Sequence, residues 1–226
     1  MKISEAVKRS QVKGPVWILA SESPRRREIL KKLGVEFRVD PSGISEPARK
    51  PGEAPSRYAA RIARMKVKEV AKRNRTGLIL GADTIVVLGN RILMKPENRA
   101  AARSMLNNLS GRWHQVVTGI CLWDCERLKA YSASGISRIH FRRLSPQEIE
   151  WYLGTGEYQD KAGAYGIQGY ASLFIDRIEG CYFNIVGFPV ALFETLCRKA
   201  GINLIKTLSR KKLTQRHEDA KTQENL

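Results

Sequence analysis

Two serines and a run of arginines stand where a predicted strand gives way to a predicted helix. The apolar residues 16–20 predict the strand; Ser23 then suits the N-cap of a helix and Pro24 its first position. Arg25 and Arg26 would lie in the first helical turn, where the helix dipole disfavours cations. An anion held there by backbone N–H groups, serine hydroxyls and arginine side chains would favour them. The alternative interpretation is a solvated basic turn.

Two carboxylates could complete the chemistry of such a site. Asp83 follows the apolar residues 78–82, and strand ends in α/β proteins open onto clefts. Glu46 lies in the polar loop 41–47, and together the two would hold Mg²⁺ or Mn²⁺, which prefer oxygen ligands. Taken alone, Asp83 could equally cap its own turn, and Glu46 could be a solvated loop residue.

Two lysines and a glycine-rich loop are further candidates. Lys66 lies among apolar positions of a predicted helix, and Lys95 follows an apolar run; the alternative for both is a side chain that reaches water. Glycines at three positions of residues 160–170 suit a tight loop pressed against a ligand. Within this loop Gln168 offers a donor and an acceptor, which suits the edge of a base. The plain alternative is a turn between strands.

The bulk properties describe a protein with a packed core. The chain has 226 residues, of which 42% are hydrophobic, enough for one large or two small domains. No apolar run reaches the roughly 18 residues that a membrane span needs. Residues 1–15 lack the apolar middle of a signal peptide, so we expect a cytoplasmic protein. The four cysteines are scattered, which favours free thiols in a reducing compartment.

The formal net charge of +18 favours polyanionic partners, namely nucleic acid, acidic lipid or phosphorylated small molecules. Charge alone does not choose among them, and no pattern of a nucleic-acid-binding module is present. The sequence also lacks a P-loop, a dinucleotide fingerprint and the nucleophile elbow of serine hydrolases. The three histidines show no metal-ligand spacing.

Helical and strand patterns alternate along the chain and predict an α/β fold, with a mixed central sheet flanked by helices. The start of one helix is marked by Ser145, Pro146 and Glu148, which form a capping-box pattern. Helices are predicted near 24–33, 55–73, 97–109, 146–154 and 189–200. Strands are predicted near 16–20, 78–82, 85–88, 91–94, 113–123, 130–142, 172–178 and 181–186. The basic ends, 1–15 and 206–226, fall outside the predicted domain, 16–205.

Several of these segments, in the same order, resemble the Maf family of nucleoside triphosphate pyrophosphatases, also named septum formation inhibitors. The segments are Leu19-Ala20-Ser21 with Ser23-Pro24-Arg25-Arg26, Gly81-Ala82-Asp83-Thr84, Lys95-Pro96, Leu109-Ser110-Gly111 and residues 160–169. The likeness runs from about residue 16 to 203. It implies two lobes around a cleft, as in inosine triphosphate pyrophosphatases, a divalent cation and a homodimer.

The resemblance also implies a substrate and roles for residues. Residues 160–169 are similar to the branch that hydrolyses dTTP and UTP to the monophosphate and pyrophosphate; the other main branch acts on 7-methyl-GTP. Asp83 would be the proton acceptor and, with Glu46, a metal ligand. Three residues would match positions tied to substrate choice: Arg25, Thr84 and Gln168. Further pocket positions would be Ser21, Arg26, Lys66, Lys95 and Asp160.

Two departures and one competing function remain. Ser45 and Glu46 stand where the family often has Asp-Glu, and Asn98 stands where it often has an acidic residue. By this interpretation the cations neutralise a triphosphate, while Gln168 and Thr84 bond a uracil or thymine ring, modified pyrimidines included. The competing class is a non-enzymatic regulatory protein that binds nucleic acid through its positive charge.

Overall fold

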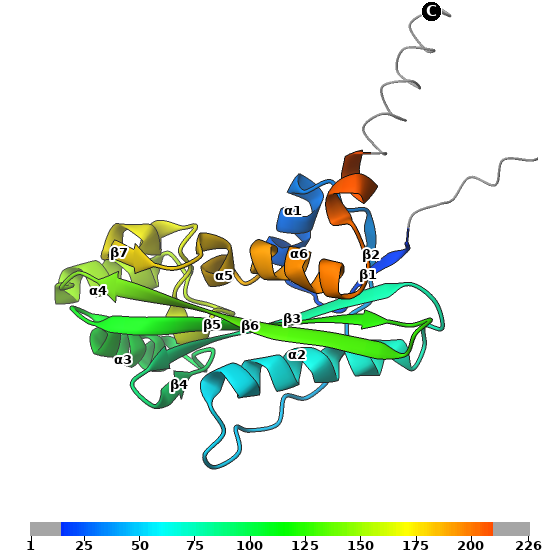
Figure 1. Cartoon of the computed structure of the whole chain (residues 1–226). Coiled ribbons are helices and arrows are strands. Elements are labelled where there is room, and N and C mark those ends of the chain that lie inside the picture. The colour runs from blue at the N-terminus through cyan, green and yellow to red at the C-terminus, as the bar shows by residue number, and fades with distance from the viewer. Residues whose placement is uncertain (1–14, 210–226) are drawn as a thin grey trace, which may run out of the picture.

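The computed structural model describes residues 15–209, which form a mixed α/β fold around a seven-stranded sheet (Figure 1). The strand order is β2-β1-β3-β5-β6-β7, and β4 pairs with β3 off this path. The strands are β1 (Trp17–Leu19), β2 (Phe37–Val39), β3 (Leu78–Leu88), β4 (Arg91–Leu93), β5 (Trp113–Asp124), β6 (Lys129–Phe141) and β7 (Ile175–Glu179). The predicted fold class, a mixed sheet flanked by helices, is confirmed.

Helices cover both faces of this sheet. The α-helices are α1 (Pro24–Lys32), α2 (Pro55–Ala71), α3 (Arg99–Leu109), α4 (Pro146–Gly154), α5 (Tyr182–Val186) and α6 (Val190–Lys199). Two 3-10 helices are η1 (Ala162–Ala164) and η2 (Tyr170–Phe174). Figure 1 shows α2 on one face, with α1, α5 and α6 on the other. Glycine lets α2 approach closely, because a Cβ on Gly119 would lie 2.2 Å from the backbone carbonyl of Ala59.

One edge of β3 has a gap in its pairing. β5 pairs with residues 78–87 along the other edge of β3. On the gapped edge, β1 pairs in parallel with residues 78–80, and β4 pairs antiparallel with residues 86–88. Residues 81–85 therefore have a strand partner on only one side, so a ligand at the gap can reach the backbone edge of β3 and side chains from both faces.

The hydrophobic core divides along the length of β3, which accounts for the predicted two lobes. Leu80 and Ala82 belong to a cluster that also holds Leu30 of α1. Val86 belongs to a second cluster, which joins α3, α4 and the 3-10 helices and includes Tyr152. Thr84 lies between these two clusters, at the gap. On the opposite face, Asp83 lies between two further clusters, which hold Ile79 and Ile85.

Most predicted elements are present, and helix ends follow their capping residues. The capping box is confirmed, since the Glu148 N–H donates to Ser145 Oγ at 3.2 Å and the Ser145 N–H donates to Glu148 Oε2 at 2.8 Å. Asn98, which departs from the family pattern, caps α3 by accepting from the Ala101 N–H at 2.8 Å. Ser23 occupies the N-cap of α1, but its side chain makes no capping hydrogen bond.

Two strand predictions are corrected. Residues 181–186, predicted as a strand, contain helix α5, which ends at Gly187 with a φ of 109°. Residues 172–178 begin inside η2, and the strand β7 starts only at Ile175. The segments predicted separately at 78–82 and 85–88 form one continuous strand, β3.

The ends of the chain lie mostly outside the described residues. Of the predicted basic ends, only residue 15 and residues 206–209 are described, and the latter continue a helical turn that begins at 204. The four cysteines, all within the described part, are free thiols. Among the helices that the structure describes, none is long and apolar enough to span a membrane.

Candidate functional site at a gap in the sheet

Asp83 and Thr84 lie side by side in β3 at the gap, on opposite faces of the sheet. Asp83 faces α2, and Thr84 faces α1 and α5, as their contacts show. Each residue therefore organises a separate group of polar side chains. The gap brings the two groups to one place.

On the α2 face, a lysine joins two carboxylates. Lys66 Nζ lies 2.8 Å from Asp83 Oδ1 and 2.6 Å from Glu46 Oε1. The side chains of Lys66 and Asp83 are only 13% and 7% exposed, so this is not a lysine that reaches past the helix edge into solvent. Asp83 Oδ2 is buried and has no hydrogen-bond partner. That oxygen is the acceptor which the protein leaves free.

On the opposite face, the buried guanidinium of Arg26 is fixed by three acceptors. Its Nε donates to the Gly187 carbonyl at 2.9 Å, Nη1 donates to Ser21 Oγ at 2.9 Å, and Nη2 donates to Thr84 Oγ1 at 3.1 Å. A guanidinium has five N–H donors, so one on each Nη remains for an anion. The Arg26 side chain at the start of α1 is thus held in place by three hydrogen bonds, and two of its N–H donors remain unused.

The two groups interact electrostatically across the gap. Burial lowers the pKa of Arg26, and the negative charges of Asp83 and Glu46 act in the opposite direction. Arg25 adds to the lowering of the Arg26 pKa, so the cationic charge is concentrated at the start of α1. Burial, followed by the charge of Arg25, also lowers the pKa of Lys161 in the glycine-rich loop. An anion between these cations would relieve their mutual repulsion.

Gln168 lies in an apolar pocket of about 280 Å³ between α1 and α5. The pocket's lining residues are Glu28, Ile29, Lys32, Leu33, Gln168, Tyr182, Phe183 and Val186. Val186 directly precedes Gly187, whose carbonyl binds Arg26, so the pocket adjoins the arginine group. Aromatic rings, aliphatic side chains and one amide suit a nucleobase, and the ion pair between Glu28 and Lys32 adds a charged border.

Two predicted site residues are not joined to this cluster. Lys95 and Asp160 are exposed, and within residues 15–209 neither makes a hydrogen bond or ion pair with Asp83, Lys66 or Arg26. Both border the glycine-rich loop: the Gly163 N–H donates to the carbonyl of Met94, the residue before Lys95. Asp160 adjoins Lys161 in sequence and opposes the lowering of its pKa.

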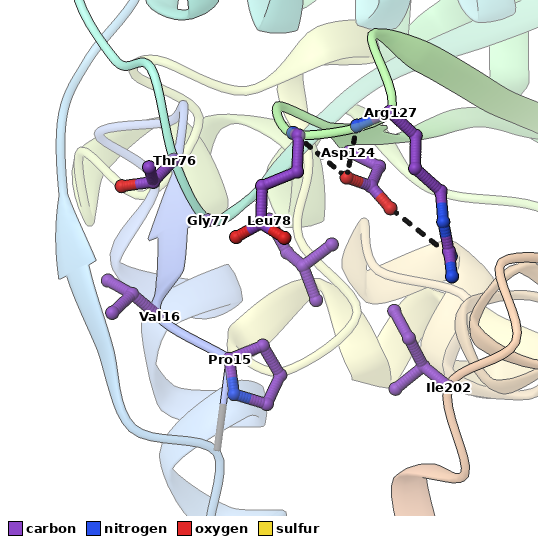
Figure 2. Close-up of a pocket in the computed structure, with 9 residues that line it drawn as sticks. Pro15, Val16, Thr76, Gly77, Leu78, Asp124, Arg127 and Ile202 are labelled. Carbon is purple, nitrogen blue, oxygen red and sulfur yellow. Dashed lines mark hydrogen bonds and ion pairs between the residues drawn. The ribbon is translucent and has the colours of Figure 1, made fainter. Parts of the chain in front are cut away.

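A larger pocket, of about 440 Å³, lies elsewhere, beside the start of β3 (Figure 2). It is bordered by Pro15, Leu78 and Ile202, and none of the predicted site residues lines it. Two carboxylates line it, Asp124 and Glu126, and Asp124 already accepts from the backbone and side chain of Arg127. Size therefore does not mark the functional site in this chain.

A metal ion would need ligands beyond the protein. In the described part of the chain, no group of three or more His, Cys, Asp and Glu side chains could hold a metal ion. Mg²⁺ commonly binds one or two carboxylates and completes its shell with water and substrate phosphates. Asp83 fits such a role through its free Oδ2, and Glu46 lies beside it on the same lysine.

Sequence reasoning missed three residues that hold Arg26 in place: Thr118, Asn184 and Gly187. Thr118 Oγ1 lies 3.0 Å from Thr84 Oγ1 and donates to the Asn184 carbonyl at 2.8 Å. A signal was present for Thr118, because a hydroxyl inside the apolar run of β5 needs a buried partner. Asn184 gave none, since residues 181–186 were predicted as a strand, and Gly187 lay in the connection after it.

These features define a two-lobed α/β protein with cations and carboxylates gathered at a break in its sheet. The chain belongs to the Maf family, because the family model described as Maf-like protein matches residues 16–200. The dTTP/UTP pyrophosphatase of Syntrophomonas wolfei is 44% identical over 188 residues, 83% of this chain and 99% of that protein. The dTTP/UTP pyrophosphatase of Clostridioides difficile is 48% identical over 189 residues, 83% and 96% of the two chains.

Among solved structures, the Staphylococcus aureus Ham1 protein is a distant match. The match covers 55% of this chain and 71% of the Ham1 chain, with 15% sequence identity and a TM-score of 0.40.

Proposed function

We propose that this protein is a nucleoside triphosphate pyrophosphatase that hydrolyses dTTP and UTP to the monophosphate and pyrophosphate. The names of its Maf relatives support the substrate class. The observation that carries the proposal is the gap in β3, where Arg26 on one face and the Lys66–Asp83 pair on the other reach the same opening. Phosphoryl chemistry depends mainly on positioning and charge stabilisation, which this arrangement supplies.

The cations bind the triphosphate, which carries about four negative charges near neutral pH. Arg26 offers its two remaining N–H donors, and Arg25 adds charge at the start of α1. Lys66 has a second role, since it holds the carboxylates of Asp83 and Glu46 together. Lys95 and Lys161 lie in or beside the glycine-rich loop and can approach a phosphate chain that extends toward it.

Asp83 is the proposed proton acceptor for the attacking water. Lys66 fixes the carboxylate through Oδ1, which leaves Oδ2 free to take the proton. The water attacks the α-phosphorus and pyrophosphate leaves. Mg²⁺ or Mn²⁺ would supply Lewis-acid neutralisation of phosphate charge, held by Glu46 and the substrate phosphates when Asp83 Oδ2 serves as the base.

The apolar pocket beside Arg26 is the proposed site of the pyrimidine ring. Gln168 can donate and accept along the edge of uracil or thymine. A base with the wrong hydrogen-bonding pattern would leave the Gln168 amide without a partner beneath the bound ring, which weakens binding strongly.

A substrate panel tests this proposal. The purified protein is incubated with Mg²⁺ or Mn²⁺ and with dTTP, UTP, CTP or 7-methyl-GTP, and the products are separated by chromatography. We expect monophosphate and pyrophosphate, with dTTP and UTP as the preferred substrates. Release of orthophosphate and a diphosphate would contradict the cleavage site, and preference for 7-methyl-GTP would assign the chain to the other branch.

The role of Asp83 is tested by Asp83→Asn, which removes the proton acceptor and keeps the shape. We expect kcat to fall about a hundredfold or more, as for loss of a general base. The matched control is Asp176→Asn. Asp176 is an exposed carboxylate in β7 that contacts His140 and none of the site residues. An Asp83→Asn variant with full activity would show that another group takes the proton.

We also propose a cellular location and an oligomeric state for this protein. A cytoplasmic site agrees with the four free thiols, because a reducing compartment maintains them. The homodimer implied by the family resemblance stays a prediction, which light scattering of the purified protein would test.

A further inference from the structure

A chain of hydrogen bonds leads from Arg26, through the partly buried Thr84, into the buried interior of the sheet. The chemistry of its members determines where each hydroxyl proton lies. This chain of hydrogen bonds runs from the Arg26 guanidinium to Thr84, then to Thr118, which lies opposite Thr84 in β5, and then to the carbonyl of Asn184 in α5. The side chain of Asn184 is anchored in turn, because its Nδ2 donates to the Val116 carbonyl and to another hydroxyl, each at 3.0 Å.

The direction of each bond follows from the chemistry of the end groups. A carbonyl oxygen only accepts, so Thr118 must donate its single hydroxyl proton to Asn184. Thr118 can therefore only accept in its 3.0 Å contact with Thr84, and Thr84 must be the donor there. The guanidinium of Arg26 only donates, so Thr84 accepts from it. Thr84 thus has no proton left for a phosphate oxygen or a base carbonyl.

Helix α5 contacts Arg26 directly as well as through the two threonines. The Gly187 carbonyl at the end of α5 accepts from Arg26 Nε at 2.9 Å, and the Asn184 carbonyl inside α5 accepts from Thr118. Arg26, Thr84, Thr118 and α5 form a closed ring of contacts. A ring of this kind restricts the guanidinium to one orientation, with one N–H donor on each Nη not used by the ring or by Ser21.

We propose that Thr118 is a positioning residue that acts through Thr84 on Arg26, and that Thr84 affects substrate choice by holding this guanidinium for the phosphates. The inference rests on the proposed function for its substrate, and it gives Thr84 a role toward the phosphates in place of a hydrogen bond donated to the pyrimidine. It predicts that loss of either hydroxyl weakens binding of the phosphate chain, with or without a base.

Inorganic tripolyphosphate, which has no base, separates the two roles in a calorimetric titration that needs no turnover. We expect Thr84→Val and Thr118→Val each to weaken its binding about tenfold, the worth of a hydrogen bond to a charged group. The double variant should be no weaker than the worse single one, because both act in one chain. Thr118→Ser keeps the hydroxyl and should bind as wild type does. Thr195→Val changes a partly exposed threonine on α6 that bonds only the Ala191 carbonyl of its own helix, and it should leave binding unchanged.

Kinetics with UTP and CTP provide the second readout. Both valine variants should lower kcat/KM for the two nucleotides by the same factor, so the UTP to CTP ratio stays constant. The proposal is overturned if Thr84→Val leaves tripolyphosphate binding intact, or changes the UTP to CTP ratio while Thr118→Val does not. A wild-type protein that binds tripolyphosphate but does not hydrolyse UTP would instead contradict the proposed function. Thermal unfolding of each variant shows whether the fold is kept.

Discussion

At the scale of single residues, the site depends on a charge pair that is almost fully removed from water. The side chains of Lys66 and Asp83 are 13% and 7% exposed, and Lys66 forms the ion pair that the structure shows for Asp83, while it also contacts Glu46 at 2.6 Å. Removing one partner of a buried pair leaves an uncompensated charge, which costs more than losing both. The pair therefore matters for stability as well as for chemistry, and the two roles can be separated.

Lys66→Met tests that separation. We expect its free energy of unfolding to fall by about 3 kcal/mol, because Asp83 stays buried without its cation. The double variant Lys66→Met/Asp83→Asn should recover most of that loss yet remain inactive, since the proton acceptor is gone. Urea unfolding in EDTA measures the first effect and UTP turnover the second. Equal stability of the single and double variants would show that the Lys66–Asp83 pair does not determine this free energy.

His114 predicts a pH dependence of stability that is independent of the site. It is buried between Phe141 and Tyr165, and burial lowers its pKa from 6.5 to about 4. Between these two values the unfolded chain binds a proton and the folded protein does not, so stability falls as the pH drops from 6.5 to 4. The contribution is about 3 kcal/mol for a shift of this size.

The measurement compares urea unfolding of wild type and His114→Gln at pH 7 and at about pH 4. The glutamine keeps a polar group near Tyr165 Oη, which lies 2.7 Å from His114 Nε2. We expect the variant to lose less stability than wild type over this interval. An identical loss in both proteins would mean that other groups account for the acid sensitivity.

At the scale of elements, the site depends on how closely α2 lies against the sheet, because α2 carries Lys66. Gly119→Ala should destabilise the fold by about 1–3 kcal/mol, since its Cβ would lie 2.2 Å from the backbone of Ala59. It should also lower kcat/KM for UTP by displacing Lys66. The matched control is Gly154→Ala at the end of α4, where a Cβ meets nothing within 4 Å. If both variants behave alike, close packing of α2 is not the cause.

The same scale shows what local sequence patterns can predict. The capping box at Ser145 and the apolar stripe of α2 were predictable, because they depend on residues within one or two helical turns. Helix α5 was not: residues 182–186 are mostly aromatic or β-branched, which favours a strand, and packing on the sheet overrides that preference. Its helical form is nonetheless what brings Asn184 and Gly187 to the arginine group.

The site itself was only partly predictable. Single residues stood out by type: Arg26 by its place in the first turn of a predicted helix, and Asp83 as a carboxylate after an apolar run. The expected strand end at Asp83 was wrong, because β3 continues through it to Leu88 and a gap in strand pairing opens the site instead. Their contacts could not be predicted from the sequence. Glu46, Lys66 and Asp83 come from a loop, a helix and a strand, and no spacing along the chain predicts that they lie within hydrogen-bonding distance. The gap in β3 depends on where β1 and β4 stop pairing, which a sequence pattern with errors of a few residues does not locate.

At the scale of the whole molecule, the net charge of +18 predicts that added salt weakens non-specific anion binding more than anion binding at the site. The field of exposed cations draws in any polyanion, and salt screens it within about 10 Å at 0.1 M. Contacts at the gap are screened much less, because Arg26 and Lys66 are largely buried. Ionic strength should therefore weaken nucleic-acid binding far more than it weakens binding of a triphosphate.

A salt series from about 0.05 M to about 0.5 M KCl tests this with two probes, UTP and a short single-stranded DNA. We expect KM for UTP to rise moderately while kcat changes little, because screening acts on the approach of the anion and not on the buried contacts that hold it. DNA binding should fall steeply, since each released counterion adds to its salt dependence. Tight DNA binding that survives high salt, in a protein without UTP turnover, would favour the regulatory nucleic-acid-binding function. The positive surface increases the local concentration of the anionic substrate, and the buried cations determine which anion binds tightly.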